Sequence, residues 1–526
     1  MTEQKMVSLT IEGRPVSVPE GMSILEAAKT AGVLVPHYCY HPGLPVAGVC
    51  RMCLVEVEKM PKLAPACATS VMEGQVVHVH SPKALEARKG VLEFLLINHP
   101  LDCPICDQAG ECELQDYTFA EGRADSRYRE PKRFNPMEDF GGDVLYVQNR
   151  CILCTRCVRF MSDVSHEPVL NVSERGDRAF IGKADGHDLT NPWAANVIDL
   201  CPVGALLSKD FLNKARAWEL DRAPTICTGC SQGCNAVAET RDNVVVRLKP
   251  RANDQVNQYY LCDVGRLSYR EFNRRDRLDQ PLLRQGGTLE VAEWDRAIET
   301  AATMLSGRRV TMLVSPNLSN EAMFLIRGIA AQCGAEMAMV IPRGDESPLP
   351  GAPDLSLRAE RAANATGARA MGVREAASVQ TAVAGAEVVL VVGDLPEGTS
   401  ASDFAVGTSI VYAGTVLSAV VTGLAQVVLP LTTVLEEEGT LTNLRGRVQR
   451  FLQAKTAPGV ARPSWFVLAD LLQAVGGSGA FYLPSEVFAA MTATLPAFAG
   501  LEYDALGLRG LPMGTGTGAA PAEVTA

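Results

Sequence analysis

The run Arg150-Cys151-Ile152-Leu153-Cys154-Thr155-Arg156-Cys157 decides how the rest of this chain is interpreted. Its C-x2-C-x2-C spacing is typical of a loop that wraps a [4Fe–4S] cluster. The cysteine that often follows three residues later is replaced by Met161, and a remote Cys201-Pro202-Val203-Gly204-Ala205 segment offers the closing cysteine instead. The simplest interpretation is one [4Fe–4S] cluster, with structural zinc as the alternative. The expected ligands are Cys151, Cys154, Cys157 and Cys201.

A set of four cysteines precedes this run, with the spacing C-x10-C-x2-C-x13-C. Apolar residues alternate with polar ones from Val7 to Ile11 and predict a strand, which a turn at 12–14 joins to a second strand over 15–18. A capping box that begins at Ser23 predicts a short helix ending near Gly32. This order resembles a β-grasp plant-type ferredoxin, although the first gap is longer, and it predicts a [2Fe–2S] cluster, with zinc as the alternative. The expected ligands are Cys39, Cys50, Cys53 and Cys67.

A histidine stands in place of one cysteine in the next set, which is spaced H-x3-C-x2-C-x5-C. Apolar residues at helical spacing predict a helix over 84–97 that ends at Asn98, because Pro100 follows. His99 would then lie in a turn beside the cysteines and is better explained as a fourth ligand than as a surface residue. Three thiolates and one imidazole suit a [4Fe–4S] cluster or zinc, so the spacing leaves both open. The expected ligands are His99, Cys103, Cys106 and Cys112.

The last set has the spacing C-x2-C-x3-C-x27-C, with a predicted strand over 243–248 between its third and fourth cysteines. This pattern resembles the N-terminal cluster domain of molybdopterin oxidoreductases and predicts another [4Fe–4S] cluster. A zinc ribbon is the alternative. The expected ligands are Cys227, Cys230, Cys234 and Cys262.

The composition is that of a globular protein, with 47% hydrophobic and 21% charged residues in 526. A net charge of −11 argues against nucleic acid as the main partner. All but one of the 16 cysteines precede residue 263, and the polar start predicts no secretory signal peptide, so disulfides are not expected. The uncharged segment 404–435 is long enough to cross a bilayer, but its glycines, Pro430 and β-branched runs favour a buried strand–helix–strand unit.

Taken together, the four sets closely resemble the large iron–sulphur subunits of respiratory complex I, the NADH:quinone oxidoreductase. The resemblance covers residues 1–270 and rests on three further matches in the local sequence, CRMCLVE at 50–56, HPLDCPICD at 99–107 and RCILCTRC at 150–157. It implies that the set with one histidine binds a [4Fe–4S] cluster. The expected cofactors are therefore one [2Fe–2S] and three [4Fe–4S] clusters.

Residues 271–526 resemble the family's molybdopterin-type domain more weakly, through VVLVVG at 388–393, QVVLP at 426–430 and the EGTLTN and GRVQ runs that follow. We interpret this part as a degenerate scaffold without molybdenum, in which Cys333 is a buried structural thiol. The predicted fold is α+β and multidomain, with an N-terminal β-grasp domain. The expected domains are 1–83 (2Fe–2S ferredoxin), 84–135 (4Fe–4S with one His and three Cys), 136–220 (4Fe–4S ferredoxin-like), 221–276 (4Fe–4S of molybdopterin-oxidoreductase type), 277–509 (truncated molybdopterin-oxidoreductase-like scaffold) and 510–526 (a flexible tail).

The sequence contains no nucleophile–base constellation, no phosphate loop and no dinucleotide fingerprint, so the chain is not expected to bind NADH itself. The predicted chemistry is outer-sphere electron transfer between its clusters. The resemblance implies that electrons arrive from a flavin-bearing NADH-oxidising subunit and leave toward quinone through other peripheral-arm subunits of complex I, a translocase. It also implies that the fourth cluster lies off the main route. It places the chain peripherally on the cytoplasmic face of the inner membrane, with the membrane arm contacted only indirectly.

Other functions remain open at this point. They are a cluster subunit of an NAD-linked hydrogenase or formate dehydrogenase, a structural assembly protein stabilised by metal, and a zinc-ribbon binding module. Buried negative clusters need nearby cations or backbone donors. Four arginines next to the ligand loops are candidates for this role, and solvated surface charge is the alternative. They are Arg51, Arg150, Arg156 and Arg159.

Overall fold

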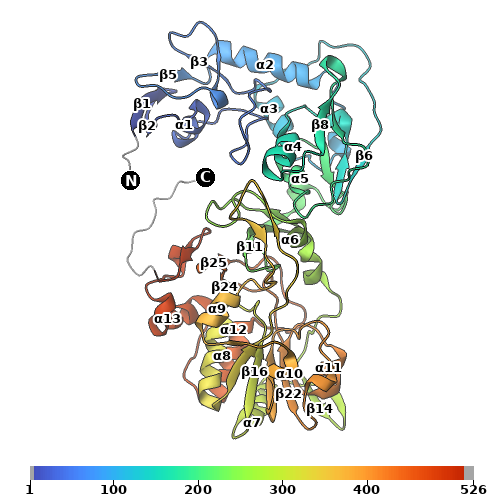
Figure 1. Ribbon diagram of the computed structural model, residues 1–526, viewed down its shortest axis with the longest axis vertical. Coiled ribbons are helices and arrows are strands. Elements are labelled where there is room, and N and C mark those ends of the chain that lie inside the picture. Colours follow the sequence, from blue (N-terminus) through green and yellow to red (C-terminus); the bar gives the residue numbers. More distant parts are fainter. Residues whose placement is uncertain (1–4, 515–526) are drawn as a thin grey trace. The chain divides into compact units, whose positions relative to one another are not determined.

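The computed structural model describes residues 5–514. It divides into two compact units (Figure 1). Unit 1 consists of Met1–Leu220 with the short segment Leu349–Ala352, and unit 2 consists of Asp221–Pro348 and Pro353–Ala526. The domain limits expected from the sequence stay predictions. The first three ligand sets belong to unit 1 and the fourth belongs to unit 2.

Unit 1 begins with a five-stranded sheet and one helix, in the order expected for a β-grasp domain. The predicted hairpin and the predicted helix are confirmed, and the Ser23 side chain caps the helix by accepting from the Glu26 backbone N–H. The hairpin, the helix and the later strands enclose one apolar core that includes Cys53 and Cys67. The elements are β1 (Met6–Ile11), β2 (Arg14–Pro19), α1 (Ile24–Thr30), β3 (Leu54–Val57), β4 (Ala64–Pro65) and β5 (Val76–His78).

A long helix, α2 (Pro82–Leu96), leads from this sheet to the second ligand set. Its N-cap is Ser81 and its C-cap is Ile97, so it ends within one residue of the predicted end. The rest of unit 1 is made of short elements connected by the cysteine-bearing loops. They are α3 (Glu113–Glu121), β6 (Glu138–Gly141), β7 (Val144–Tyr146), α4 (Arg156–Arg159), β8 (Leu170–Ser173), β9 (Phe180–Lys183), α5 (Asn196–Leu200) and β10 (Leu206–Ser208).

Unit 2 opens with a three-stranded antiparallel sheet that carries the fourth ligand set. Its strands are β11 (Asp221–Ile226), β12 (Asn235–Arg241) and β13 (Val244–Pro250), and the short helix α6 (Asp263–Leu267) follows. The third strand confirms the one predicted over 243–248. The first three cysteines of the set lie in the connection between β11 and β12, and Cys262 caps α6.

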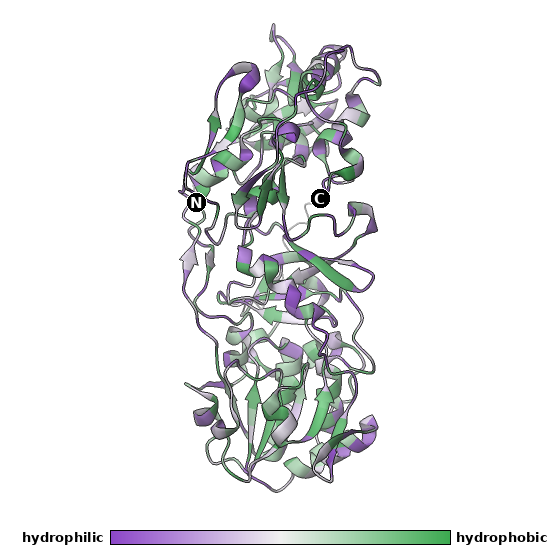
Figure 2. Ribbon diagram, turned by 90° about the vertical axis from the view of Figure 1, so that its right-hand side faces the viewer, coloured by the Kyte–Doolittle hydropathy of each residue, from purple (hydrophilic) through white to green (hydrophobic). Residues whose placement is uncertain are grey.

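The centre of unit 2 is an eight-stranded sheet in which β23, β22, β21, β16, β17 and β20 are parallel neighbours, with β14 and β15 antiparallel at one edge. All five residues of β21 are buried. Alternate residues of this strand pack against different helices, because Val388, Leu390 and Val392 join the core with α7, α8 and α12, whereas Val389 and Val391 join the core with α10 and α11. Both faces are therefore covered, which explains the continuous apolar strands that appear green in Figure 2.

The elements of this part are β14 (Leu282–Gln285), β15 (Thr288–Val291), α7 (Trp294–Leu305), β16 (Val310–Val314), α8 (Asn320–Cys333), β17 (Glu336–Met339), α9 (Ala365–Ala370), β20 (Arg374–Glu375), α10 (Val379–Ala382), β21 (Val388–Val392), β22 (Ser409–Gly414), α11 (Ala419–Leu424), β23 (Ala425–Pro430), α12 (Ser464–Ala474) and α13 (Pro484–Thr494). The uncharged segment 404–435 thus folds as the predicted strand–helix–strand unit. No helix in the described range is long and apolar enough to cross a membrane.

Two details differ from the expectations. Cys333 is only half-buried, because it lies in the last turn of α8 at the margin of the core. The segment expected to be a tail begins with a strand, β26 (Leu511–Pro512), which pairs with β25 (Arg447–Phe451), itself the partner of β24 (Gly439–Thr442). Gly510 turns the chain into this strand with a positive φ of 72°. The remainder of the expected tail, 515–526, lies outside the described residues.

Candidate iron–sulphur sites

The ligands expected from the C-x2-C-x2-C run come together. Cys151, Cys154, Cys157 and Cys201 line one small apolar cavity, whose wall also includes Tyr146 and Ile181. Burial raises the pKa of Cys151 to about 11 and that of Cys154 to about 12. Four thiols crowded in this way can all ionise only if they surround a positively charged group, so the donor set fits an iron cluster.

The loop that presents these ligands has an unusual backbone. Leu153 and Thr155, on either side of Cys154, have φ angles of 53° and 60°, which a β-branched residue such as threonine rarely adopts. The turn directs the Leu153 backbone N–H toward the Cys151 sulphur at 3.4 Å. Such N–H···S contacts stabilise negative charge on sulphur and help to set a cluster's potential.

The first ligand set also converges. The Cys53 and Cys67 sulphur atoms are 3.4 Å apart, and the Cys39 backbone N–H lies 3.5 Å from the Cys50 sulphur. Hydrogen bonds among the thiols lower the pKa of Cys39 and raise the pKa of Cys50 and of Cys67. The thiols thus share protons that iron would replace, as expected for ligands of one cluster.

The second set is more open. Cys103 is exposed, and charge interactions connect Cys106 with Cys103 and with Cys112. The pKa of His99 falls to about 4, mainly because of burial and further because of the positive charges of Lys132 and Arg150. The imidazole is therefore neutral at pH 7, which is the form that binds metal. Its Nδ1 is buried and has no hydrogen-bond partner in the described structure. These features fit a metal ligand, although no contact described in 5–514 joins His99 to the three cysteines.

Gly204 connects the second and third sets and was not singled out as important from the sequence. A Cβ atom at this position would lie 2.2 Å from the Cys106 sulphur, so only glycine allows the contact. The Pro202 carbonyl in the same segment accepts from the Glu113 backbone N–H at 3.1 Å. The segment that closes the third ligand set therefore forms part of the wall of the second set. The fixed Cys-Pro-x-Gly spacing was the only signal available for this contact.

The fourth set differs from the other three in that all four of its cysteines are buried, each being 4–5% exposed. Burial raises the pKa of Cys227 to about 12. The Gly229 N–H lies 3.5 Å from the Cys227 sulphur, and the Gly265 N–H lies 3.3 Å from the Cys262 sulphur. A Cβ atom on Gly265 would lie 2.8 Å from the Cys227 sulphur, so this glycine keeps the two ligands close together. The donor set and its N–H groups fit a cluster here as well.

Buried amides surround this fourth set, and sequence reasoning missed them. Asn235 donates to Gln449 at 2.6 Å, Gln449 donates to the Gly233 carbonyl at 2.9 Å, and Asn443 donates to the Gln232 carbonyl at 3.3 Å. These bonds join the ligand loop to β25 and to the turn before it, more than 200 residues away in sequence. The loop of the fourth set is thus anchored by the second half of the chain.

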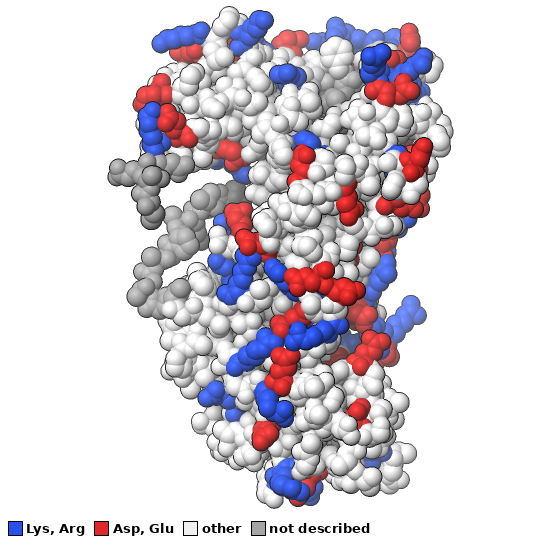
Figure 3. Space-filling model, in the orientation of Figure 1, with Lys and Arg blue, Asp and Glu red and all other residues white. Residues whose placement is uncertain are grey.

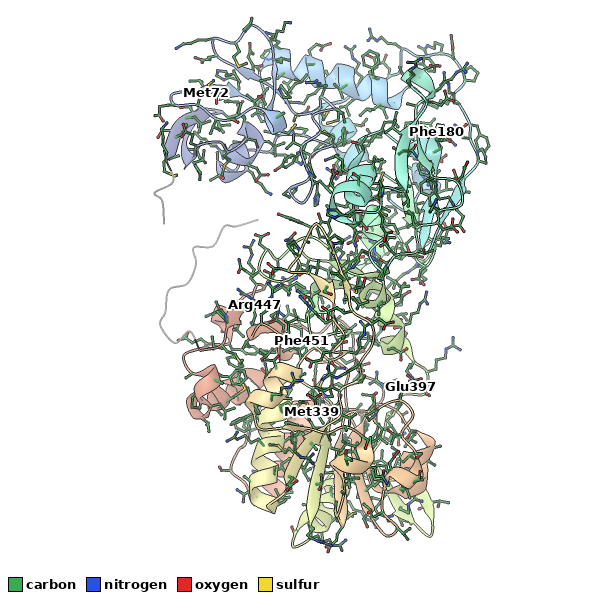
Figure 4. The ribbon with its side chains drawn as sticks, viewed as in Figure 1. Met72, Phe180, Met339, Glu397, Arg447 and Phe451 are labelled. Carbon is green, nitrogen blue, oxygen red and sulfur yellow. The ribbon has the colours of Figure 1, made fainter. Side chains whose placement is uncertain are left out.

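A larger cavity of about 480 Å³ lies in unit 2 at the carboxyl ends of β16, β21 and β22. Its wall includes Gly229 of the fourth ligand loop, together with Glu397 and Phe451, which are labelled in Figure 4. Ligands of open α/β sheets bind in such crevices at the carboxyl ends of the strands. The cavity marks the cleft side of the molybdopterin-type sheet. The expected absence of molybdenum stays a prediction.

Three of the four candidate arginines are not solvated surface charges. Charges of both signs are interspersed over the face shown in Figure 3, but Arg150 and Arg156 are only 7% and 4% exposed. Arg150 pairs with Asp102 at 2.9 Å, and Arg156 pairs with Glu113 at 3.3 Å. Arg159 is partly buried and donates to backbone carbonyls. Arg51, in contrast, is exposed with a positive φ of 59°.

The order of these sites and folds defines the class of protein, a multidomain iron–sulphur protein. The chain matches five family models, and these confirm the predicted fold class. They are "2Fe-2S iron-sulfur cluster binding domain" over 4–82, "NADH-ubiquinone oxidoreductase-G iron-sulfur binding region" over 88–127, "NADH-quinone oxidoreductase subunit 3, ferredoxin-like domain" over 141–207, "Molybdopterin oxidoreductase Fe4S4 domain" over 220–274 and "Molybdopterin oxidoreductase" over 358–474.

Within this class, the chain is similar to the G subunits of NADH-quinone oxidoreductase. It is 40% identical to the G subunit of Rickettsia bellii over 332 residues, which is 62% of this chain and 49% of the relative. It is 46% identical over 302 residues to the mitochondrial NADH-ubiquinone oxidoreductase 78 kDa subunit of Candida albicans, covering 57% and 42% of the two chains. The chain thus spans about half the length of the curated relatives it matches.

A solved structure of an NAD+-reducing [NiFe]-hydrogenase in the H2-reduced state is also similar. It is 29% identical, with a TM-score of 0.37, over 40% of this chain and 90% of that chain.

Proposed function

We propose that this chain is the electron-transfer subunit of an NADH:quinone oxidoreductase, which relays electrons from a flavin-bearing, NADH-oxidising subunit toward quinone. The observation that carries the proposal is the physical continuity of the sites in unit 1. The segment that closes the third ligand set also contacts Cys106 of the second set. Arg159 contacts backbone carbonyls of the first and third sets. Contiguous sites favour electron relay over three independent structural metal sites.

The clusters would supply one-electron redox chemistry when bound, and the protein would set their potentials. One [2Fe–2S] cluster would be held by Cys39, Cys50, Cys53 and Cys67. Three [4Fe–4S] clusters would be held by the set of His99, Cys103, Cys106 and Cys112, by the set of Cys151, Cys154, Cys157 and Cys201, and by the set of Cys227, Cys230, Cys234 and Cys262. The chain's own groups bury these sites and direct N–H donors at their sulphur atoms.

The partners under this proposal are the other peripheral-arm subunits, and the chain contacts the membrane arm only indirectly. Its site of action is the cytoplasmic face of the inner membrane. The names of the relatives, which are subunits of NADH-quinone and NADH-ubiquinone oxidoreductases, support partnership with other subunits of such a complex.

Metal analysis of the chain purified anaerobically within its native complex tests the proposal. We expect about 14 iron atoms per chain, with negligible zinc and molybdenum. We also expect NADH to reduce the clusters and membrane subunits with a quinone site to co-purify. Stoichiometric zinc would support a metal-stabilised assembly protein or a zinc-ribbon module. A hydrogenase or formate dehydrogenase among the co-purifying proteins would support a cluster subunit of such a soluble enzyme. About 10 iron atoms would remove one [4Fe–4S] assignment.

A further inference from the structure

Two arginines on one turn of α4 reach from the third ligand set to the loop of the first. The Arg159 guanidinium donates to the Cys39 carbonyl at 2.5 Å and to the Cys154 carbonyl at 3.3 Å. Arg156 donates to the Tyr40 carbonyl at 2.8 Å and to the Leu200 carbonyl at 3.2 Å. Arg159 therefore contacts one expected ligand of the first set and one of the third. Arg156 contacts a residue directly beside a ligand in each of the same two sets.

The two arginines differ in how their charge is balanced. Arg156 pairs with the Glu113 carboxylate. Arg159 forms no ion pair with a carboxylate anywhere in 5–514, and its partners are backbone carbonyls and the Thr155 hydroxyl at 3.3 Å. The Asp163 carboxylate acts on Arg159 through a longer-range charge interaction and not through an ion pair, so the charge of Arg159 can also act on the two nearby ligand sets, which would be negative when they hold clusters.

The local backbone fixes this arrangement. Thr155, with its positive φ of 60°, begins the turn that carries Arg159, and its hydroxyl accepts from the Arg159 Nε. The planar guanidinium then has its remaining N–H groups directed at the two ligand loops. An ammonium group is a point charge on a flexible stem and cannot reproduce this fork, so a lysine at this position would keep the positive charge without the fork.

We propose that Arg159 is a positioning residue shared by the first and third clusters, which joins their ligand loops and favours the reduced state of both. This inference rests on the proposed function. A positive charge beside two clusters raises both potentials together, so electrons are held more tightly at each site while the difference between the sites is largely kept. A residue that belonged to one cluster would move only that cluster's potential.

The test is redox titration of both clusters by EPR in the assembled complex. Three variants are compared with the wild type: Arg159→Gln, which removes the charge, Arg159→Lys, which keeps it, and Arg51→Gln as a matched control. Arg51 lies between two ligands of the first set in sequence, but it is exposed, so solvent screens its charge. In Arg159→Gln, we expect the equilibrium constant for reduction of each cluster to fall about tenfold, which equals about 59 mV for one electron.

In Arg159→Lys and in Arg51→Gln, the equilibrium constant for reduction of each cluster should stay within about threefold of the wild-type value. The inference is overturned if Arg159→Gln moves one potential or neither, or if Arg51→Gln produces the same paired shift. If Arg159→Gln does not retain its clusters, Arg159→Lys decides. Retained clusters with wild-type potentials in Arg159→Lys would support the proposed effect of the charge. Loss of both clusters in Arg159→Lys would overturn it, because the charge would still be present. Absence of either EPR signal in the wild type would instead refute the proposed function.

Discussion

The ligand sets of unit 1 and the single set of unit 2 are held by different kinds of group. In unit 1, guanidinium groups contact the ligand loops, and the third set contributes to the wall of the second. Several ligands there are only partly buried, and Cys103 is exposed. In unit 2, all four cysteines are buried, and neutral amides join their loop to the scaffold. The contacts of unit 1 connect sites to one another, whereas those of unit 2 connect a site to its own domain.

The largest expected effect separates these two kinds of site. Cys154→Ala should abolish NADH-to-quinone electron transfer, because it removes a ligand in the connected series. Cys230→Ala should remove the fourth cluster and largely spare turnover, because the resemblance implies that this cluster lies off the main route of the electrons. The measurement is NADH:quinone activity at equal assembly, with EPR to confirm which cluster is lost. Equal loss of turnover in both variants would contradict the comparison.

The next effect concerns a glycine in each unit. In Gly204→Ala, the new Cβ would lie 2.2 Å from the Cys106 sulphur, so the ligand must move and the second cluster should be lost. In the control, Gly229→Ala, the new Cβ would lie 3.5 Å from the Cys227 sulphur, an ordinary contact. Iron should fall from about 14 to about 10 per chain in the first variant only. Unchanged iron in Gly204→Ala would show that the contact is not required.

A smaller effect is expected at His99. Replacement of a neutral imidazole by a thiolate adds one negative charge, so His99→Cys should keep a [4Fe–4S] cluster, lower its potential and slow electron transfer through it. His99→Ala should destabilise that cluster. EPR redox titration of the assembled complex measures both outcomes. An unchanged potential in the first variant, or an intact cluster in the second, would mean that another residue completes the set.

The smallest effect lies in the scaffold of unit 2 and leaves the clusters of unit 1 untouched. Burial raises the pKa of Glu321 to about 8, from an ordinary value of 4.5, and raises that of Glu437 to about 7. The folded chain keeps protons that the unfolded chain releases, so stability should fall as the pH rises from about 5 to about 8. The melting temperature of Glu321→Gln should depend less on pH than that of the wild type, by a few degrees across this range. Parallel pH profiles would contradict this.

The sequence predicted what depends on short spacing. Cysteines separated by two intervening residues, the Ser23 cap and the apolar run of β21 are local patterns, and each has few structural solutions. The contacts of Gly204, Arg159 and Gln449 were not predictable in the same way, although Arg159 was a candidate cation from its place beside a ligand loop. Arg159 contacts a residue 120 positions away, and Gln449 contacts one 216 positions away. Nothing in the local pattern specifies such pairings. Strand β26 was missed for the same reason, because the two-residue segment Leu511–Pro512 has no strand signal until β25 offers a partner.

The amides that hold the fourth ligand loop also have a consequence for the order of events during synthesis. The ligands of the first three sets have all been made once Cys201 is added, but Gln449 follows Gly233 by 216 residues. At roughly 5–20 residues per second, that interval lasts about 10 to 40 s. We therefore expect the nascent chain to present three nearly finished sites to the cell's cluster-delivery machinery well before the fourth. The fourth cluster should be the last to be inserted and the first to be missing when iron is scarce.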